Sequence, residues 1–515
     1  MPFALSAALV LLPPAPPVVV VDRDDVEVRE SCTLVFPRPV ADADGDGVVH
    51  VVADGVVVDL AGATLDSGLD RAQPDRFAGQ GIVVSAKRVT VRNGAVRGFK
   101  VAVSGDGCDG GVFERLDLSD NFAQRLRSTK EKEDAADWLY PHDNDRGQQV
   151  DAHGAGLSIV GAREVVVREV RARRTQNGIV FRRVDDSKVY DCDCSFLSGW
   201  GLAMWRSSRN VVARNSFDFC VRGYSHGVYN RGQDSAGILL FEQCSDNLVA
   251  LNSATHCGDG VFGFTGREAL GEAPCPSSTI DFDDPLAWYR RRGCVGNRFV
   301  ANDLSYAAAH GLEMTFSFAN EIRGNRMVGN AICGIWGGYS QDMVVVGNEF
   351  GGNGEGAYGR ERGGVNIEHA RRARIARNRF EGDRAGVVLW DDEDAHLAKL
   401  PWAKANGVRC EENEIAGNRF RAVAVAVELR EARATRLSGN RFEDCGAELV
   451  EERCEGTVVA EAEAAPDADA ARIAELLRGL PGSRVAVGAR AHLRGRDRIA
   501  MGEFGPLEPP GGDAR

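Results

Sequence analysis

Short apolar runs, each opened by a glycine, recur along most of the chain at a nearly constant spacing. Each run has the form Gly-Φ-x-Φ-x, where Φ is an apolar residue, as in GIVFR, GLAMW, GILLF and GVVLW. The opening glycines are Gly156, Gly178, Gly201, Gly237, Gly260, Gly311, Gly334, Gly364 and Gly386. Successive glycines are 22, 23, 36, 23, 51, 23, 30 and 22 residues apart. The repeating unit therefore has 22 or 23 residues, and the longer gaps contain insertions.

Most units end in a second, polar motif of the form Asn-x-Phe, as in ARNSF, GNRFV, GNEFG, RNRFE and GNRFR. A unit of this length fits one coil of a parallel β-helix, in which three short strands are separated by turns and coils stack about 4.8 Å apart. Asparagines at equivalent turns can then hydrogen-bond to the coils above and below. We expect the opening glycines to supply turn dihedrals that other residues resist. The repeat thus predicts an all-β, single-stranded parallel β-helix solenoid with loop insertions.

One early segment carries a family resemblance. The stretch ADGVVVDLAGATLDSG, from Ala53 to Gly68, resembles the opening coil of bacterial members of the pectate-lyase-like superfamily, which share repeats with the copper-maturation protein NosD and with mannuronan epimerases. The resemblance covers residues 45–455 and implies a right-handed parallel β-helix. It implies no single activity, because lyases, hydrolases, epimerases and inert surface proteins share this fold. The epimerase signature Y-G-x-D-P-H-D is echoed only by YPHDND at Tyr140–Asp145, which lacks the preceding Gly-x-Asp, so no epimerase residues are assigned.

Both ends of the chain depart from the repeat. Residues 1–21 are predicted to be a signal peptide or an apolar N-terminal arm, residues 22–455 the β-helix, and residues 456–515 an acidic linker, a short helix and a C-terminal tail or cap. The N-terminal apolar run is too short to span a bilayer, because prolines interrupt it. It resembles a secretory signal, although no Lys or Arg precedes it, and therefore indicates a secreted, periplasmic or cell-surface protein.

The C-terminal helix is predicted from apolar residues on one side, namely Ile473, Leu476 and Leu477, with Gly479 near its end. We expect the segment after it to add a strand or to cap the last coil.

Charge and cysteine content exclude several classes of partner. The net charge of −13 argues against a nucleic-acid partner and against an anionic membrane surface. The thirteen cysteines are scattered and suit buried interior positions, with Cys275 and Cys294 as the best candidates for a disulfide. The sequence DADGDG from Asp42 matches the first half of a calcium-binding EF-hand loop, but position twelve is Ala53 instead of Glu. A Gly/Asp turn without a cofactor is the favoured interpretation, with Ca²⁺ as the alternative.

Alternation within the glycine-led strands predicts which side chains point outward. Taking each glycine as zero, the outward positions of successive coils are Arg182, Trp205, Phe241, Asp259, Phe262, Phe264, His310, Glu313, Trp336, Glu368 and Trp390. Exposed aromatic rings beside carboxylates suit sugar recognition, because a pyranose stacks on an indole while its hydroxyls bind carboxylates. The alternative is that the aromatic rings pack under loops as a satellite core.

Long insertions flank this face. Those at 120–153, 221–235 and 351–362 precede glycine-led strands, and those at 265–293 and 391–406 follow them. Long loops in a compact array are usually functional or disordered. We therefore expect them to wall the face into a groove.

Glycoside hydrolysis needs one protonated and one ionised carboxyl group. We predict that Glu313 is the acid, because Trp336 and Phe262 would raise its pKa by desolvation, and that Asp259 or Glu368 is the ionised partner. A structural or solvated role remains the alternative for each. Substrate-binding roles are predicted for His310, His369, Trp336, Trp205, Trp390, Tyr339 and Arg182.

A dense polar loop, GYSHGVYNRGQDSAG, runs from Gly223 to Gly237. Its His226, Tyr229, Arg231 and Asp234 are predicted to clamp a sugar, with Arg231 able to make a bidentate contact. The alternative is a loop that is hydrogen-bonded internally.

These features favour a carbohydrate-active enzyme that acts on a polysaccharide or oligosaccharide, first as a glycoside hydrolase. A polysaccharide lyase or epimerase on a uronate-containing glycan is the second interpretation, because the outward face offers Arg182 and His310 as basic residues but no Lys. A non-catalytic glycan-binding or structural β-helix is the third.

Overall fold

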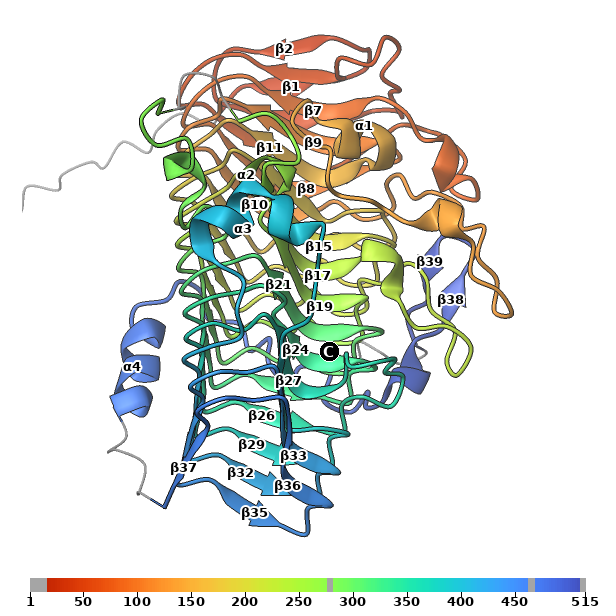
Figure 1. Cartoon of the computed structure of the whole chain (residues 1–515). Coiled ribbons are helices and arrows are strands. Elements are labelled where there is room, and N and C mark those ends of the chain that lie inside the picture. The colour runs from red at the N-terminus through yellow and green to blue at the C-terminus, as the bar shows by residue number, and fades with distance from the viewer. Residues whose placement is uncertain (1–15, 276–280, 462–467, 510–515) are drawn as a thin grey trace, which may run out of the picture.

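The computed structural model describes residues 16–275, 281–461 and 468–509. Most of the predicted signal segment and part of the acidic linker lie outside these residues. The described chain winds into a stack of coils, with its first coils at one end and its last at the other (Figure 1). All pairings between coils are parallel, so the predicted parallel β-helix is confirmed.

Sheet 2, the 15-stranded sheet, carries the glycine-led strands. Its strands, in spatial and chain order, are β2 (Val26–Val28), β4 (Val49–Val51), β7 (Gln80–Val84), β9 (Val101–Asp106), β11 (Ala155–Val160), β13 (Ile179–Arg182), β15 (Trp200–Trp205), β17 (Ala236–Phe241), β19 (Asp259–Phe264), β21 (His310–Thr315), β24 (Cys333–Trp336), β27 (Gly363–Glu368), β30 (Val387–Trp390), β33 (Val425–Arg430) and β36 (Ala447–Glu452).

Sheets 1 and 3 form the other faces of the coils. The strands of sheet 1 are β1 (Val18–Val20), β3 (Cys32–Val35), β5 (Val57–Asp59), β6 (Thr64–Asp66), β8 (Thr90–Arg97), β10 (Val112–Asp117), β12 (Val166–Arg168), β14 (Lys188–Tyr190), β16 (Val211–Ala213), β18 (Leu248–Ala250), β20 (Arg298–Val300), β22 (Glu321–Arg323), β25 (Val344–Val346), β28 (Arg374–Ala376), β31 (Glu414–Ala416), β34 (Arg436–Ser438) and β37 (Val458–Ala460). Those of sheet 3 are β23 (Arg326–Val328), β26 (Glu349–Gly351), β29 (Arg379–Glu381), β32 (Arg419–Arg421) and β35 (Arg441–Glu443).

The register of sheet 2 follows the glycine series of the sequence. Leu157 pairs with Ile179, Ile179 with Leu202, and Val261 with Leu312, each being the residue after one of the glycines. The insertion of 51 residues between Gly260 and Gly311 therefore leaves the register intact. Glycine is needed at these positions for a reason other than the expected turn dihedrals. A Cβ at Gly178 would lie 2.5 Å from the carbonyl oxygen of Gly201. Close approach of neighbouring coils, and not a left-handed turn, excludes a side chain there.

Asparagine ladders and stacked rings tie the coils together inside the helix. One ladder runs through Asn215, Asn252, Asn302, Asn325, Asn348, Asn378, Asn418 and Asn440, and from Asn252 onward each side-chain oxygen accepts from the asparagine of the preceding coil. Phe350, Phe380, Phe420 and Phe442 stack with ring centroids 4.8, 4.7 and 5.4 Å apart. The buried side-chain amides of this ladder are thus satisfied by repetition.

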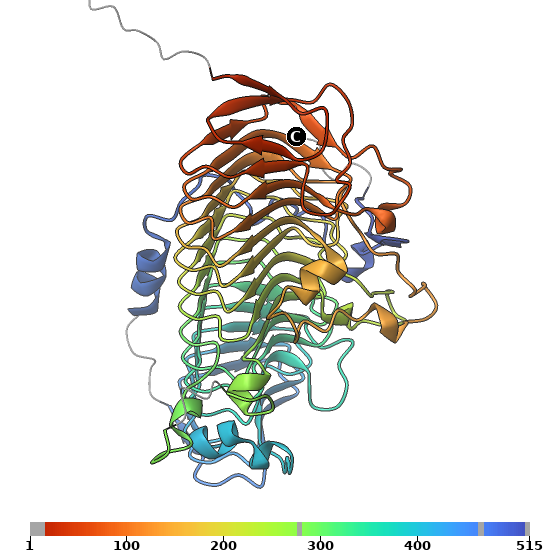
Figure 2. The same cartoon turned by 90° about the horizontal axis from the view of Figure 1, so that it is seen from above.

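Insertions carry the short helices α1 (Gln148–His153), α2 (Arg267–Leu270) and α3 (Pro401–Asn406). In both views α2 and α3 lie beside one edge of sheet 2, while α1 and the loops before β17 and β27 lie beside the other (Figures 1 and 2). Loops therefore flank sheet 2 on both sides, as the sequence predicts.

The C-terminal segment returns along the outside of the coils. Helix α4 (Ala468–Leu477) packs Ile473, Leu476 and Leu477 beside Ala250 and Val300 of sheet 1, which confirms the predicted apolar side. Figure 2 shows it beside the stack. The hairpin of β38 (Met501–Gly502) and β39 (Gly505–Pro506) then follows.

The expectation that this segment caps the last coil is wrong. The Leu126 amide donates to the Glu503 carbonyl, so the hairpin lies against the early insertion. Arg490 is buried between Asp193 and Asp218 of middle coils. These ion pairs draw the tail back along the helix.

Two further expectations are settled here. All thirteen cysteines are free, so the proposed pairing of Cys275 with Cys294 is wrong. Among the described residues, no helix has the length and apolar character needed to cross a membrane.

Candidate active site

Asp259, His310 and Glu313 lie together on sheet 2, as their spacing predicts. β19 and β21 are neighbours in register, and the His310 amide donates to Asp259 Oδ1 at 2.8 Å. His310 Nε2 lies 3.9 Å from Glu313 Oε2. One oxygen or nitrogen of each side chain lies within 4.8 Å of those of the other two. The three therefore form one polar cluster on the outward face.

Glu313 is held in surroundings that favour its protonated form. Phe262 and Trp336 pair with it in register on either side, and its side chain is 19 % exposed. Burial raises the pKa of Glu313 well above its usual range, and nearby Asp259 and Asp234 raise it further. The predicted direction of this pKa shift agrees with the structure.

Two insertions bring further acids to the cluster. Asp234, in the loop before β17, has a pKa raised to about 6 by burial. Glu361, in the loop before β27, also has a pKa raised by burial, which a hydrogen bond from Tyr358 and the charge of Arg231 oppose. The Arg231 guanidinium lies over the Tyr358 ring at 4.5 Å. Both loops therefore meet beside Glu313.

The aromatic part of the predicted surface needs correction. Trp205 and Phe241 are fully buried, and Trp205 Nε1 donates to the Pro141 carbonyl at 2.9 Å. His142 of the same loop packs edge-on against Phe241. Residues 120–153 thus cover these rings as a satellite core, the alternative considered from the sequence. Trp205 is not an exposed sugar platform, whereas Trp336 is half-buried beside Glu313.

Glu368 and His369 form a separate cluster. Glu368 pairs in register with Trp390, and its carboxylate gathers with His369 and Asp392 instead of with Asp259. The Trp390 ring is buried, and its Nε1 donates to Asn366 Oδ1 at 3.0 Å. Glu368 is therefore misplaced for the role of ionised partner to Glu313, and Trp390 for stacking on a sugar.

Several predicted binding residues hold loops together instead. Arg182 Nη1 donates to the Asp145 carbonyl at 2.5 Å, and the Tyr229 hydroxyl donates to the Thr129 carbonyl at 2.6 Å. His226 is exposed, with Nδ1 2.8 Å from the Tyr224 hydroxyl. The Tyr339 hydroxyl lies 3.4 Å from Asp394 Oδ2. Within the loop from Gly223 to Gly237, His226 is thus bonded internally, whereas Tyr229 is bonded to the insertion at 120–153.

The acidic N-terminal turn behaves as a turn. Asp42 Oδ1 accepts the Gly45 amide at 2.7 Å, and Asp42 Oδ2 accepts the Gln80 amide at 2.7 Å. Two backbone amides thus hold the carboxylate of Asp42 in a turn, while Asp24, Asp42 and Asp44 bring carboxylate oxygens within 4.8 Å of one another, so the turn without a cofactor and the Ca²⁺ alternative both stay predictions.

Glu361 and Tyr358 were not predicted from the sequence. Alternation assigns direction only within strands, and both residues lie in an insertion whose conformation it does not determine. The available signal was the insertion itself, which places residues 351–362 beside the glycine-led strand.

A cavity of 570 Å³ lies elsewhere, between early coils and the C-terminal hairpin, with Phe77 and Phe504 in its lining.

Comparison with known proteins gives structural likenesses only. No family model and no curated protein sequence matches the chain. One similar solved structure is the catalytic unit of a GH87 α-1,3-glucanase from Streptomyces thermodiastaticus, with 11 % identity and a TM-score of 0.40 over 78 % of this chain and 63 % of that one. A second is the A-module of mannuronan C-5 epimerase AlgE6 from Azotobacter vinelandii, with 12 % identity and a TM-score of 0.37 over 87 % of this chain and 90 % of that one. A third is an alginate lyase from a Paenibacillus species, with 12 % identity and a TM-score of 0.30 over 75 % of this chain and 95 % of that one. The chain thus spans 63 % of the glucanase unit. By its own strand pairing, the chain is a parallel β-helix protein.

Proposed function

We propose that the protein is a carbohydrate-active enzyme that hydrolyses glycosidic bonds in a polysaccharide or oligosaccharide outside the cytoplasm. The observation that carries the proposal is the meeting of Glu313 with a second, loop-borne carboxyl group in a different environment. Two carboxyl groups whose surroundings separate their pKa values can divide the roles of acid and base.

Glu313 is the general acid. Its raised pKa favours the protonated carboxyl group, and its partial exposure leaves that proton within reach of a glycosidic oxygen. Asp259 is nearly fully buried and already accepts the His310 amide, so it supports the protonated state of Glu313 instead of contacting sugar. This replaces the predicted role of Asp259 as the ionised partner.

Glu361 is the ionised carboxylate. Burial raises its pKa, but the Tyr358 hydrogen bond and the Arg231 charge limit that rise, whereas the charges near Glu313 add to the effect of burial there. It is near enough to Glu313 to raise the pKa of that residue. Trp336 and the exposed ring of Tyr358 offer apolar faces on which a pyranose can stack.

The test is a glycan library assayed for new reducing ends with the parent protein, Glu313→Gln and Glu361→Gln. Each variant is expected to lose about 10²- to 10⁴-fold in turnover. Glu349→Gln is the matched control, because Glu349 lies on sheet 3 and should retain parent turnover. If both variants at the cluster turn over substrate like the parent, or the parent binds glycans without cleaving any, the assignment is wrong.

A uronate lyase or epimerase is the second candidate, favoured by one observation. Burial, assisted by the Arg231 charge, lowers the pKa of His310 to about 3, so its imidazole is neutral at physiological pH and can hydrogen-bond a uronate group without being protonated itself. This candidate predicts unsaturated uronates or inverted C5 centres instead of new reducing ends alone. Assaying those products separately in the same library decides between the two reactions.

A further inference from the structure

A second polar cluster lies where β27 ends, and it plays no part in the proposed hydrolysis. Glu368 is the last residue of β27, and His369 follows it with φ of +52°. Consecutive strand residues normally point to opposite faces, but this left-handed residue lets both neighbouring side chains face the same place. That place is completed by Asp392 from the loop after β30.

Hydrogen bonds fix the orientation of the His369 ring. Its Nδ1 lies 2.5 Å from the Val408 carbonyl oxygen and 3.2 Å from Asp391 Oδ1. Both groups are acceptors, so Nδ1 carries the proton. The opposite nitrogen, Nε2, then presents a lone pair when the ring is neutral.

That lone pair has no hydrogen-bond donor. The His369 side chain is 2 % exposed, and its Nε2 is buried without a hydrogen-bond partner in the described part of the chain. Nε2 lies 3.6 Å from Asp392 Oδ1, and a ring nitrogen of His369 and one carboxylate oxygen each of Glu368 and Asp392 lie within 4.8 Å of one another. Three potential acceptors therefore converge, which is unfavourable unless a proton or a metal cation lies among them.

We propose that Glu368, His369 and Asp392 bind a divalent transition-metal ion, with Zn²⁺ as the best fit. One imidazole nitrogen and two carboxylate oxygens are ligands that zinc accepts, and three protein ligands leave a coordination position open. At ligand distances of about 2.0–2.2 Å, tetrahedral ligands lie roughly 3.3–3.6 Å apart, close to the observed separation of Nε2 from Asp392. The hydrogen bond from Nδ1 to a carbonyl or carboxylate is the partner that a metal-bound histidine typically has.

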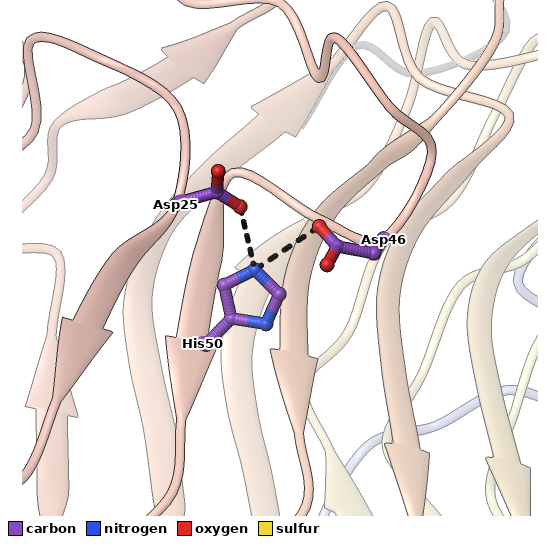
Figure 3. Close-up of side chains that lie close together, drawn as sticks. All are labelled: Asp25, Asp46 and His50. Atoms are coloured by element: carbon purple, nitrogen blue, oxygen red, sulfur yellow. Dashed lines mark ion pairs between the residues drawn. The ribbon is translucent and has the colours of Figure 1, made fainter.

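Two other histidine–carboxylate clusters lack these features. His50 Nε2 lies 3.4 Å from Asp25 and 3.3 Å from Asp46, but those carboxylates are 61 % and 62 % exposed (Figure 3). In the Asp259–His310–Glu313 cluster, His310 Nδ1 has no hydrogen-bond partner among the described residues to fix the ring. The ring fixed through Nδ1 thus distinguishes His369 from His310, and the less exposed carboxylates distinguish its cluster from that of His50.

The site lies beside the proposed catalytic cluster. The charge of Glu361 contributes to the raised pKa of Glu368, so the two clusters sense each other electrostatically. A bound cation with an open position would offer a ligand site for an anionic or hydroxyl group of a substrate. Metal binding can nevertheless be measured whether or not the protein cleaves any glycan.

The experiment is calorimetric titration of ZnCl₂ into chelator-treated, full-length protein. The parent is expected to bind one Zn²⁺ at this site, and both His369→Gln and Asp392→Asn are expected to weaken that binding at least tenfold. Asp392 is 43 % exposed, so its variant should fold even if that of His369 does not. His50→Gln is the matched control and should retain the parent's affinity.

The proposal is overturned if the parent binds no Zn²⁺ or if both cluster variants bind it like the parent. It is also overturned if His50→Gln removes the site, or if the parent binds CaCl₂ in preference to ZnCl₂. Far-UV circular dichroism of each variant confirms that a lost site is not a lost fold.

Discussion

Removing one asparagine from the middle of the interior ladder should destabilise the whole β-helix. The buried side chain of Asn302 donates to the Val249 carbonyl at 2.9 Å and to Asn325 Oδ1 at 2.9 Å. Its own Oδ1 accepts the Asn252 amide at 2.9 Å and Asn252 Nδ2 at 3.0 Å. Asn302→Ala deletes these four hydrogen bonds and leaves the Asn252 amide and the Val249 carbonyl buried without them.

The magnitude follows from those contacts. A typical net contribution of about 1 kcal/mol for each hydrogen bond gives a loss of about 4 kcal/mol in the free energy of unfolding. Urea-induced unfolding followed by circular dichroism measures it. Asn230→Ala is the control, because the half-buried Asn230 side chain makes one bond of 3.4 Å to the Gly356 carbonyl, and its loss should change stability by less than about 0.5 kcal/mol. A loss of under about 1 kcal/mol for Asn302→Ala would refute the view that the ladder stabilises the coils.

Three further predictions concern stability. Phe380→Ala should lower the free energy of unfolding in urea by about 3–5 kcal/mol, because Phe380 is stacked between Phe350 and Phe420. A decrease below about 1 kcal/mol would contradict the view that the stacked rings stabilise the coils. Arg490→Ala should lower the free energy of unfolding by about 3–5 kcal/mol and speed proteolysis of the C-terminal segment, because it leaves Asp218 and Asp193 buried without that partner. Unchanged proteolysis would argue against the docking of this segment through Arg490. Burial raises the pKa of Asp383 from 3.8 in the unfolded chain to about 7 in the folded protein. The stability that the protonated carboxyl group contributes is therefore complete below about pH 3.8 and is lost as the pH rises through about 7. Asp383→Asn should therefore melt higher than the parent at about pH 8 and nearly equally at about pH 4, and equal melting at both pH values would contradict the shift.

The fold could be predicted because a solenoid repeats its local rules. Each coil contacts its neighbours, so the glycine spacing determines the register of strands, and even the insertion before Gly311 leaves the pairing of Val261 with Leu312 unchanged. The position of His310 and Glu313 in one cluster follows from the same spacing of glycines. Helix α4 was likewise predictable, since its apolar side is local in sequence.

The site was only partly predictable, because insertions do not obey the repeat. Whether Trp205 is exposed depends on residues 120–153, which cover it through a hydrogen bond from Trp205 Nε1 to the Pro141 carbonyl. Glu361 enters the cluster from a loop whose direction alternation does not determine. The C-terminal tail docks through Arg490 onto coils almost 300 residues earlier, a pairing without a local signal.

The most direct test of the central claim is the pH dependence of kcat/KM on the glycan identified by the library, measured for the parent and for Asp234→Asn. Activity should fall on the alkaline side as Glu313 loses its proton, at a pH well above the ordinary range of a glutamate. The Asp234 charge raises the pKa of Glu313, so its removal should move that alkaline limb to lower pH. An alkaline limb that stays in place in Asp234→Asn, or that survives in Glu313→Gln, would contradict the assignment of Glu313 as the acid.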